Sequence, residues 1–307
     1  MTTNVGNSLA EVAEKIQDSV VGVRTESGEG SGVVFTGDGY VLTNNHVVAN
    51  ANGNLTVTFS DNSKTPAKLI GTDPANDLAV LKVDRSEGLH PITFGDSDAI
   101  KVGDPVLAIG NPLGYAGTVT SGILSAKNRT ISESGEEESP FAPRQSVNRL
   151  SGLLQTDAAI NPGNSGGALV DSAGRLVGIN TAIATSGSGS RGNIGVGFAI
   201  PSNKVKVVAE QLMKGGKVAH PYIGVRVSNS ETKAGAEIAG VDPGSPAEKA
   251  GLKQGDLVTA IDGKTVRNSD ELVSMVQAVQ PGSKLSLIVV RDGKTSTIEV
   301  TVGEKTS

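Results

Sequence analysis

The sequence lacks cysteine and tryptophan, and it is poor in histidine and in the other aromatic residues. Without cysteine, disulfides, thiolate metal sites and cysteine nucleophiles are all excluded. The three histidines are His46, His90 and His220, and no His-Glu-x-x-His pair occurs. The sequence therefore does not predict a histidine-rich metal site. We expect a protein that works without a metal ion or any other cofactor.

Long apolar runs and a surplus of basic charge are missing as well. No stretch approaches the ~18 consecutive apolar residues of a membrane-spanning helix. The first twenty residues lack the basic and apolar regions of a signal peptide. The 27 Lys and Arg residues against 32 Asp and Glu leave a net charge of −5. Nucleic acid is therefore not an expected partner, because no polybasic surface is present to neutralise its phosphates.

Glycine, in contrast, is abundant, at 40 of the 307 residues or 13%, against a usual ~7%. Without a collagen repeat, this glycine content indicates many tight turns, as in an all-β protein. Short β-branched runs alternate with turn residues through residues 20–200, with Asp38-Gly39 and Asn52-Gly53 as two-residue turn signals. This region is long for one sandwich, and its length suits two packed β-barrels.

Two longer helices are predicted, one on each side of this region. Residues 8–16 begin with Ser8 and Glu11 at the spacing of a capping box, and their apolar residues recur with a helical period. Residues 202–214 carry one apolar stripe, with Ser202 as the expected N-cap and a Gly-Gly pair at the end. A domain boundary is expected after the second helix.

Residues 220–304 are predicted to form a small α+β unit with short strands and two helices. The first helix has Ser245 as its N-cap and Glu248 placed to close a capping box. The second helix starts at Ser269. Two Asp-Gly pairs are expected to make hairpin turns, Asp262-Gly263 and Asp292-Gly293. In the preceding region, residues 130–150 form a long, acidic, Pro-containing segment, which is typical of a functional loop.

The most specific stretch of the sequence is QTDAAINPGNSGGAL, which starts at Gln155. Ser165 lies here within Gly-Asn-Ser-Gly-Gly, directly before a predicted strand, as an exposed nucleophile does. The glycines let the backbone turn tightly and direct successive N–H groups to one point, which builds an oxyanion hole. Its donors would be the amides of Gly163 and Ser165, with Asn164 between them. The alternative is a glycine-rich turn with an incidental serine.

A nucleophilic serine needs a base and a carboxylate that orients it. His46 ends the predicted strand YVLTNNH, whereas His90 and His220 precede prolines in polar connections and are interpreted as solvated or hinge residues. Asp77 opens the predicted strand DLAVLKV; its alternative is a turn aspartate, and a lone histidine is more often structural. The order His46, Asp77, Ser165 is that of the chymotrypsin double barrel. Since the same fold is predicted independently, the three signals support one another.

Several segments of the chain resemble the HtrA (Deg) family of serine proteases. They are TNNHVV, NDLAVLKV, GNPLG, TVTSGILSA, QTDAAINPGNSGGALV, GINTAIAT and GFAIPSN. The tail, YIGV followed by AGVDPGSPAEKAGLKQGDLVTAIDGK, resembles the PDZ domain of that family. The resemblance implies a mainly β protein, in which a chymotrypsin-like double β-barrel protease domain precedes an α+β PDZ domain. Its expected divisions are a helical segment 1–18, a protease domain 19–202, a linker helix 203–217 and a PDZ domain 218–304.

The resemblance also implies roles for individual residues. His46, Asp77 and Ser165 match the catalytic triad, and Gly163, Asn164 and Ser165 match the oxyanion turn. The pocket for the residue before the cleaved bond is matched by small aliphatic residues, which favours cleavage after Val, Ala, Leu or Ile. These are Ala159, Ile160, Ile179, Ala182 and Ile183.

Two further sites are implied by the family. Arg129 matches an arginine at the mouth of the regulatory loop, which relays PDZ or substrate occupancy to the oxyanion turn. The loop Tyr222-Ile223-Gly224-Val225 matches the PDZ segment whose amides capture a peptide C-terminal carboxylate.

The function implied is that of an ATP-independent serine endopeptidase, regulated by its PDZ domain, that degrades unfolded or damaged proteins. Its partners would be such substrates and hydrophobic C-terminal peptides. A homotrimer is implied by family analogy, although the N-terminal aromatics of the family trimer are missing, since the first aromatic residue is Phe35. The family implies an extracytoplasmic location, with an N-terminal membrane anchor before the protease domain. The chain is interpreted as a truncated soluble portion of such a protein. The competing hypothesis is a PDZ-directed chaperone or scaffold with a resting protease domain.

Overall fold

The computed structural model describes residues 8–26, 28–51, 53–85, 87–111, 117–132, 149–181, 195–215, 218–230 and 233–306. Contacts within the chain divide it into two compact units, Met1–Gly216 and Lys217–Ser307. Each unit has hydrophobic core clusters of its own. None of the described helices is both long enough and apolar enough to cross a membrane.

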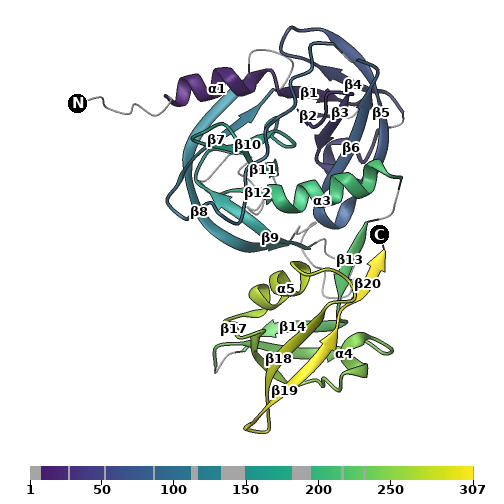
Figure 1. The fold of residues 1–307 in the computed structure, drawn as a ribbon, viewed down its shortest axis with the longest axis vertical. Coiled ribbons are helices and arrows are strands. Elements are labelled where there is room, and N and C mark those ends of the chain that lie inside the picture. The colour runs from purple at the N-terminus through teal and green to yellow at the C-terminus, as the bar shows by residue number, and fades with distance from the viewer. Residues whose placement is uncertain are drawn as a thin grey trace, which may run out of the picture. The chain divides into compact units, whose positions relative to one another are not determined.

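The first half of unit one is a closed antiparallel barrel with the strand order β1-β2-β3-β6-β5-β4 (Figure 1). Its strands are β1 (Val20–Arg24), β2 (Glu29–Val34), β3 (Tyr40–Thr43), β4 (Leu55–Thr58), β5 (Lys64–Asp73) and β6 (Leu78–Val83). Fully buried β-branched and leucine side chains such as Val21, Val41 and Leu81 fill the interior. The expected turn at Asp38-Gly39 joins β2 to β3, and Gly39 there has a positive φ of 101°.

The second half of unit one is another closed barrel, with the strand order β10-β11-β12-β9-β8-β7. Its strands are β7 (Pro105–Gly110), β8 (Thr118–Ser132), β9 (Arg149–Thr156), β10 (Ala168–Asp171), β11 (Leu176–Thr181) and β12 (Gly197–Pro201). Leu124, Leu154 and Leu169 are buried in its core. The prediction of two packed barrels is therefore confirmed.

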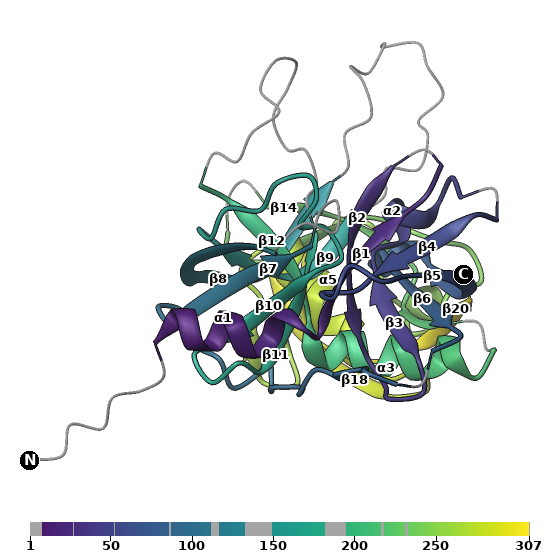
Figure 2. The same ribbon diagram turned by 90° about the horizontal axis from the view of Figure 1, so that it is seen from above.

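Two of the helices in unit one pack against these barrels. Helix α1 (Leu9–Gln17) has the predicted capping box, because Ser8 Oγ accepts from the Glu11 amide and the Glu11 carboxylate accepts from the Ser8 amide. Its buried residues Val12 and Ile16 face the barrels, and the helix lies along β7 (Figure 2). The short helix α2 (Asn45–Val48) and the 3₁₀-helix η1 (Pro74–Asn76) belong to the site described below.

Helix α3 (Ser202–Met213) covers strands of both barrels, β5 and β6 in the first and β11 and β12 in the second. The expectation that Ser202 caps this helix is wrong. Pro201 takes the N-cap position, where its fixed φ of −58° already suits the extended cap backbone. Ser202 is the first helical residue, and its hydroxyl donates instead to the Gly95 carbonyl at 2.9 Å.

Unit two contains a main sheet with the order β14-β15-β16-β18-β19, in which β17 pairs with β16, and a separate pair β13-β20. The strands are β13 (Ala219–Tyr222), β14 (Val225–Asn229), β15 (Ala236–Val241), β16 (Leu257–Ile261), β17 (Lys264–Thr265), β18 (Lys284–Arg291), β19 (Lys294–Thr301) and β20 (Gly303–Thr306). The helices are α4 (Pro246–Lys249) and α5 (Ser269–Gln277). Strand β14 lies at an edge of the sheet, which matters for the peptide site below.

Turn and cap residues of unit two behave largely as their sequence predicts. Both Asp-Gly pairs have positive φ at both positions, as tight hairpin turns require. Ser245 Oγ accepts from the Glu248 amide, but the Glu248 carboxylate accepts from the Gly244 amide rather than from that of Ser245, so the predicted capping box is only half formed. His220 lies within strand β13, which corrects its interpretation as a connection residue.

Candidate active site

His46 and Asp77 lie on two neighbouring segments of the first barrel. Strand β3 ends at Thr43, so His46 does not end a strand as expected but lies in the one-turn helix α2. Asp77 follows η1 in a left-handed backbone conformation, with φ 53° and ψ 44°, and strand β6 begins at the next residue. This local turn directs the Asp77 side chain back toward α2.

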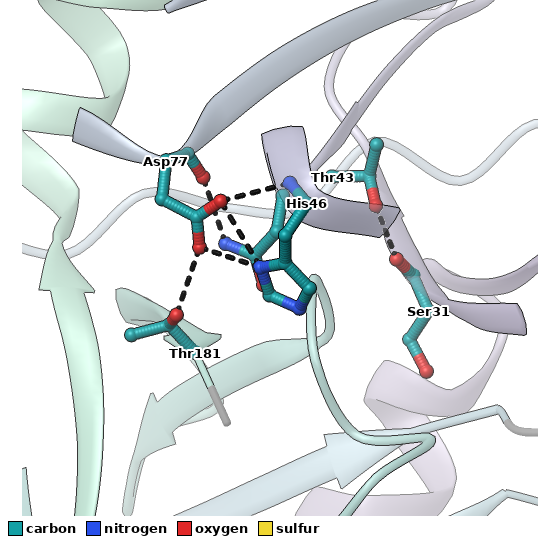
Figure 3. Close-up of polar contacts among 6 residues, drawn as sticks. Ser31, Thr43, His46, Asp77 and Thr181 are labelled. Carbon is teal, nitrogen blue, oxygen red and sulfur yellow. Dashed lines mark hydrogen bonds and ion pairs between the residues drawn. The ribbon is translucent and has the colours of Figure 1, made fainter. Parts of the chain in front are cut away.

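The Asp77 carboxylate is held by three donors (Figure 3). Its Oδ2 lies 2.8 Å from His46 Nδ1 and accepts from the Thr181 hydroxyl at 2.9 Å, while Oδ1 accepts from the His46 backbone amide at 2.9 Å. Because a carboxylate only accepts, Nδ1 carries the proton in this pair, and Nε2 of the neutral ring is the basic nitrogen. Asp77 is only 6% exposed, which strengthens these bonds.

The backbone of Asp77 is tied to the same segment. Its carbonyl accepts from the Asn44 side-chain amide at 2.9 Å and from the Asn45 amide at 3.2 Å. Together with the carboxylate contacts, these bonds fix the Asp77 backbone and side chain against the start of α2. The imidazole is therefore oriented by a rigid, buried frame, whereas its own side chain is 37% exposed.

The predicted serine segment forms a compact turn before β10. Gly163 has φ 105° and Gly166 has φ 83°, a conformation that suits glycine. A Cβ at Gly166 would lie 2.1 Å from the Ser31 carbonyl oxygen, so that position has no space for any side chain. Ser165 is 5% exposed, and its carbonyl accepts from the Ser31 amide at 2.7 Å.

Consecutive residues of β11 join this turn to the His46–Asp77 pair. The Asn180 carbonyl accepts from the Gly166 amide at 2.9 Å, and Thr181 donates to Asp77. On the other side, a Cβ added at Gly30 would lie 2.8 Å from the side chain of Val47, which follows His46, and 3.1 Å from the Ser165 carbonyl oxygen. The structure thus brings the three residues predicted as a triad into one region between the barrels.

The turn also offers a backbone donor. Among the described residues, the Gly163 amide donates to no protein acceptor, whereas the Asn164 amide bonds Asn161 and the Gly167 amide bonds Asn164. A glycine amide in this position is available to a developing negative charge, as an oxyanion hole requires. Over the described ranges, no cluster of three metal-ligating side chains is found.

The predicted pocket residues differ in their exposure. Ala159 is partly exposed, and its carbonyl accepts from Thr120 and from the Asn164 side chain. Ile160 is 7% exposed and packs in the second-barrel core, and Ile179 is fully buried, so it offers no surface to a substrate in this structure. Ala182 and Ile183 lie outside the described residues.

Arg129, predicted as a regulatory residue, lies in β8 and is exposed. Its Nε donates to the side chain of Gln155 at 2.9 Å. Gln155 lies near the end of β9, ten residues before Ser165. Arg129 therefore contacts the strand that leads directly into the serine segment.

The predicted carboxylate loop of unit two connects β13 to the edge strand β14. Gly224 has φ 81°, and a Cβ there would lie 2.2 Å from Ser245 Cβ, so only glycine fits. The carbonyls of Ile223 and Gly224 accept from residues near α4, while neither of their amides donates to an acceptor within the described ranges. Tyr222 donates to Asp242 at 3.0 Å, and burial together with that bond raises the pKa of its phenol.

Three residues that make polar contacts in the site were not predicted from the sequence. Thr181 and Asn44 bond Asp77, and Ser31 bonds the serine turn. Thr181 and Asn44 belong to the segments GINTAIAT and TNNHVV, but the resemblance implied no role for either residue. The glycines on both sides of Ser31 were the one local signal that another backbone approaches this strand closely.

Comparison with known proteins agrees with this architecture. A family model described as a trypsin-like peptidase domain matches residues 30–179, and a PDZ domain model matches residues 221–302. With its two barrels, the chain is a trypsin-like serine protease followed by a PDZ domain.

Among solved structures, the HtrA-type protease AlgW with tripeptide is 38% identical, with a TM-score of 0.74 and coverage of 97% of this chain and 98% of that one. A serine endoprotease from Yersinia pestis is 34% identical, with a TM-score of 0.67 and coverage of 98% and 100%. The chain belongs to the HtrA family of serine proteases.

Curated relatives are longer than this chain. Serine protease PepD of Mycobacterium tuberculosis is 43% identical over 97% of this chain and 66% of its own length. A probable periplasmic serine endoprotease, DegP-like, of Chlamydia trachomatis is 43% identical over 89% of this chain and 53% of its own length. The chain thus spans between half and two thirds of the length of these relatives.

Proposed function

We propose that this protein is an ATP-independent serine endopeptidase that degrades unfolded or damaged proteins under the control of its PDZ domain. In this proposal residues 19–202 form the protease domain, 203–217 a linker helix and 218–304 the PDZ domain. The observation that carries the proposal is the bond between His46 Nδ1 and the buried Asp77 carboxylate, which leaves Nε2 as the base. Such an oriented imidazole next to a serine turn is the requirement for acyl transfer.

The proposed mechanism assigns roles to the triad and to the oxyanion turn. His46 Nε2 takes the proton of Ser165 Oγ as that oxygen attacks the scissile carbonyl, and Asp77 stabilises the imidazolium that forms. The amides of Gly163 and Ser165, in the turn with Asn164, stabilise the tetrahedral oxyanion. His46 then protonates the leaving amine, and it later activates the water that hydrolyses the acyl-enzyme.

Substrate selection follows from the aliphatic segment before the turn. The predicted pocket residues other than the buried Ile179, which are Ala159, Ile160, Ala182 and Ile183, carry no charge, so cleavage after Val, Ala, Leu or Ile is expected. Extended aliphatic segments are accessible in unfolded proteins, and this argues for such substrates. The names of the relatives support a protease, and the narrower substrate class is our proposal.

The PDZ unit would bind hydrophobic C-terminal peptides. Among the described strands, β14 pairs on one side only, with β15, so an extended peptide can add to its other edge. The amides of Ile223 and Gly224, which lack acceptors among the described residues, would bind the terminal carboxylate within the loop Tyr222–Val225. Arg129, through Gln155, would pass occupancy to the oxyanion turn.

Location and assembly are proposed from the relatives. Several are named periplasmic serine endoproteases, which favours an extracytoplasmic location here. A membrane anchor is proposed by family analogy alone. A homotrimer is proposed by family analogy.

The test is degradation of casein, without ATP, by wild type and by Ser165→Ala, each with and without a hydrophobic C-terminal peptide. Wild type should degrade casein, faster with the peptide, and Ser165→Ala should lose activity while it still binds the peptide. Ser172→Ala, which changes an exposed serine of the same barrel, is the matched control and should match wild type. Residual proteolysis near wild type in Ser165→Ala would refute the triad, and no cleavage by wild type in any condition would favour the chaperone-like alternative.

A further inference from the structure

Ser31 of β2 is the polar residue through which the first barrel holds the serine turn of the second. It is fully buried, and glycines flank it on both sides. Its amide donates to the Ser165 carbonyl at 2.7 Å, and its carbonyl accepts from the Thr43 hydroxyl at 2.7 Å (Figure 3). Its hydroxyl contacts the turn as well, because Oγ lies 2.6 Å from the Gly163 carbonyl oxygen.

The direction of that hydroxyl bond is fixed by chemistry. The Asn111 amide donates to Ser31 Oγ at 2.8 Å, so Oγ accepts there. The carbonyl of Gly163 has no proton to give, so the single hydroxyl proton of Ser31 is donated to it. The Ser31 hydroxyl therefore accepts a hydrogen bond from Asn111, which follows β7, and donates one to Gly163 of the serine turn.

Two bonds from one residue thus bracket the turn. Ser31 binds the carbonyl of Gly163 and the carbonyl of Ser165, and the segment between them contains the Ser165 amide and the Ser165 Cα. The packing is tight here, because a Cβ at Gly110 would lie 2.7 Å from Asn164 Oδ1 and 2.9 Å from Ser31 Oγ. The turn has little room to shift while the hydroxyl bond is in place.

The bond from the Ser31 hydroxyl matters most for the orientation of the Gly163 amide. That amide must stay without a protein acceptor if it is to bind an oxyanion, so no bond of its own can hold it in direction. Glycine has wide conformational freedom, and the orientation of its amide depends on what holds the rest of the residue. In Gly163 the carbonyl is held, because it accepts the hydrogen bond from the Ser31 hydroxyl.

We propose that Ser31 is a positioning residue, whose hydroxyl aligns the oxyanion turn for catalysis. This inference rests on the proposed function, because it assumes that Ser165 is the nucleophile. Loss of an oxyanion donor costs about 10²–10³ in rate. Ser31→Ala keeps both donors and loses only their alignment, so a smaller loss is expected, with kcat falling about 10- to 100-fold and KM changing less than about threefold.

The experiment measures kcat and KM for a chromogenic peptide, together with inhibition by a peptide boronic acid, which forms a tetrahedral adduct. Ser202→Ala is the matched control, since Ser202 is also fully buried and also donates to a backbone carbonyl, that of Gly95. Ser31→Ala should weaken the boronic acid about as much as it lowers kcat. Ser202→Ala should lower stability similarly and leave both quantities near wild type.

Two results would overturn the proposal: a kcat of Ser31→Ala within twofold of wild type, or a loss of kcat that Ser202→Ala reproduces. If Ser31→Ala does not fold, Ser31→Cys carries the test, because its thiol is a weaker donor. It should then lower kcat at least threefold at unchanged KM, and an unchanged kcat would refute the idea. Ser165→Ala is measured in parallel: if it retains activity, the proposed function fails, whereas an inactive Ser165→Ala beside a fully active Ser31→Ala refutes this inference alone.

Discussion

Thr181 donates a 2.9 Å hydrogen bond to Asp77 across 104 positions of sequence, from the last residue of β11 in one barrel to the loop before β6 in the other. The oxygen that accepts it, Oδ2, is also the one nearest to His46 Nδ1. The carboxylate is therefore held by both barrels, and the orientation of the imidazole depends on their packing. The residue before Thr181 binds the serine turn, so one strand end serves both halves of the site.

Replacement of Thr181 by valine tests this dependence. The side chains have nearly the same shape, so Thr181→Val removes the hydroxyl bond and little packing. A hydrogen bond to a charged group contributes ~1.5–3 kcal/mol, and we expect kcat/KM for a peptide substrate to fall about tenfold. Thr25→Val, which removes a buried hydroxyl that bonds Gly28, is the control and should leave kcat/KM unchanged. Equal activities in the two variants would contradict the role of Thr181.

Much of the fold was predictable because its signals are local. The capping box of α1 and the Asp-Gly turns depend on residues a few positions apart, and the structure contains them where the sequence predicts them. Two of the errors arise where a residue distant in sequence supplies the contact. The Ser202 hydroxyl donates to the Gly95 carbonyl and does not cap its own helix. His46 lies in a helical turn, where its backbone amide donates to the Asp77 carboxylate.

In the candidate site, too, some residues are predictable from local sequence and others are not. Ser165 and its glycines form a contiguous motif, so sequence alone proposes a nucleophile with its oxyanion turn. Thr181 and Ser31 are ordinary residues of buried strands, and their contacts exist only after both barrels close. No local pattern distinguishes Thr181 from the many threonines that simply fill a sheet, and the glycines beside Ser31 indicate only that another backbone approaches closely, not which one.

Gly224→Ala should abolish peptide binding by the PDZ unit. The added Cβ would meet Ser245 Cβ at 2.2 Å and displace the loop that carries the Ile223 and Gly224 amides. Gly244→Ala is the control, because Gly244 also has a positive φ, of 73°, but nothing lies within 4 Å of a Cβ there. Calorimetric titration with a hydrophobic C-terminal peptide should detect binding by Gly244→Ala only. Cleavage of a short chromogenic peptide without that ligand should be unchanged in both, and undiminished titration of Gly224→Ala would refute the loop assignment.

Lys204 should give the protein a stability that rises with pH. Burial lowers the pKa of its amine from 10.5 to about 8, against an opposing effect of Asp73, and the amine donates to the Ser151 carbonyl at 2.9 Å. Between these pKa values the unfolded chain holds a proton that the folded chain has released, so the free energy of unfolding increases with pH.

The measurement for Lys204 compares thermal unfolding of wild type and Lys204→Met at pH 7 and pH 9.5. Wild type should gain about 1–2 kcal/mol relative to the variant over this interval. Lys206→Met, which changes an exposed lysine of the same helix, should show no such gain. A constant difference between wild type and Lys204→Met would contradict a lowered pKa.

Arg291 should be the most sensitive charged residue of the second unit. It binds Asp256 through two bonds, Nε to Oδ1 at 2.5 Å and Nη2 to Oδ2 at 2.7 Å, and Asp256 is fully buried. Burial alone would raise the pKa of Asp256, but the bonds from Arg291 and from the Lys253 amide outweigh burial and lower it below 3.8. The pair therefore contributes stability above pH 3.8, and the contribution is lost as pH falls through the folded pKa.

Arg291→Ala would leave that buried carboxylate without its cation. Breaking a fully buried pair costs ~3–5 kcal/mol, and because Arg291 is about a third exposed, we expect a smaller loss of stability near pH 7. Native-state hydrogen exchange of β16 and β18 amides measures this locally, with β10 amides as the internal reference. Arg267→Ala, which breaks a more exposed pair with Glu271, should cost well under 1 kcal/mol. The excess cost of Arg291→Ala should shrink as pH falls toward 3.8 and below, since protonation of Asp256 removes the charge that the arginine neutralises. A pH-independent cost would mean that Arg291 stabilises the unit by packing rather than through its charge.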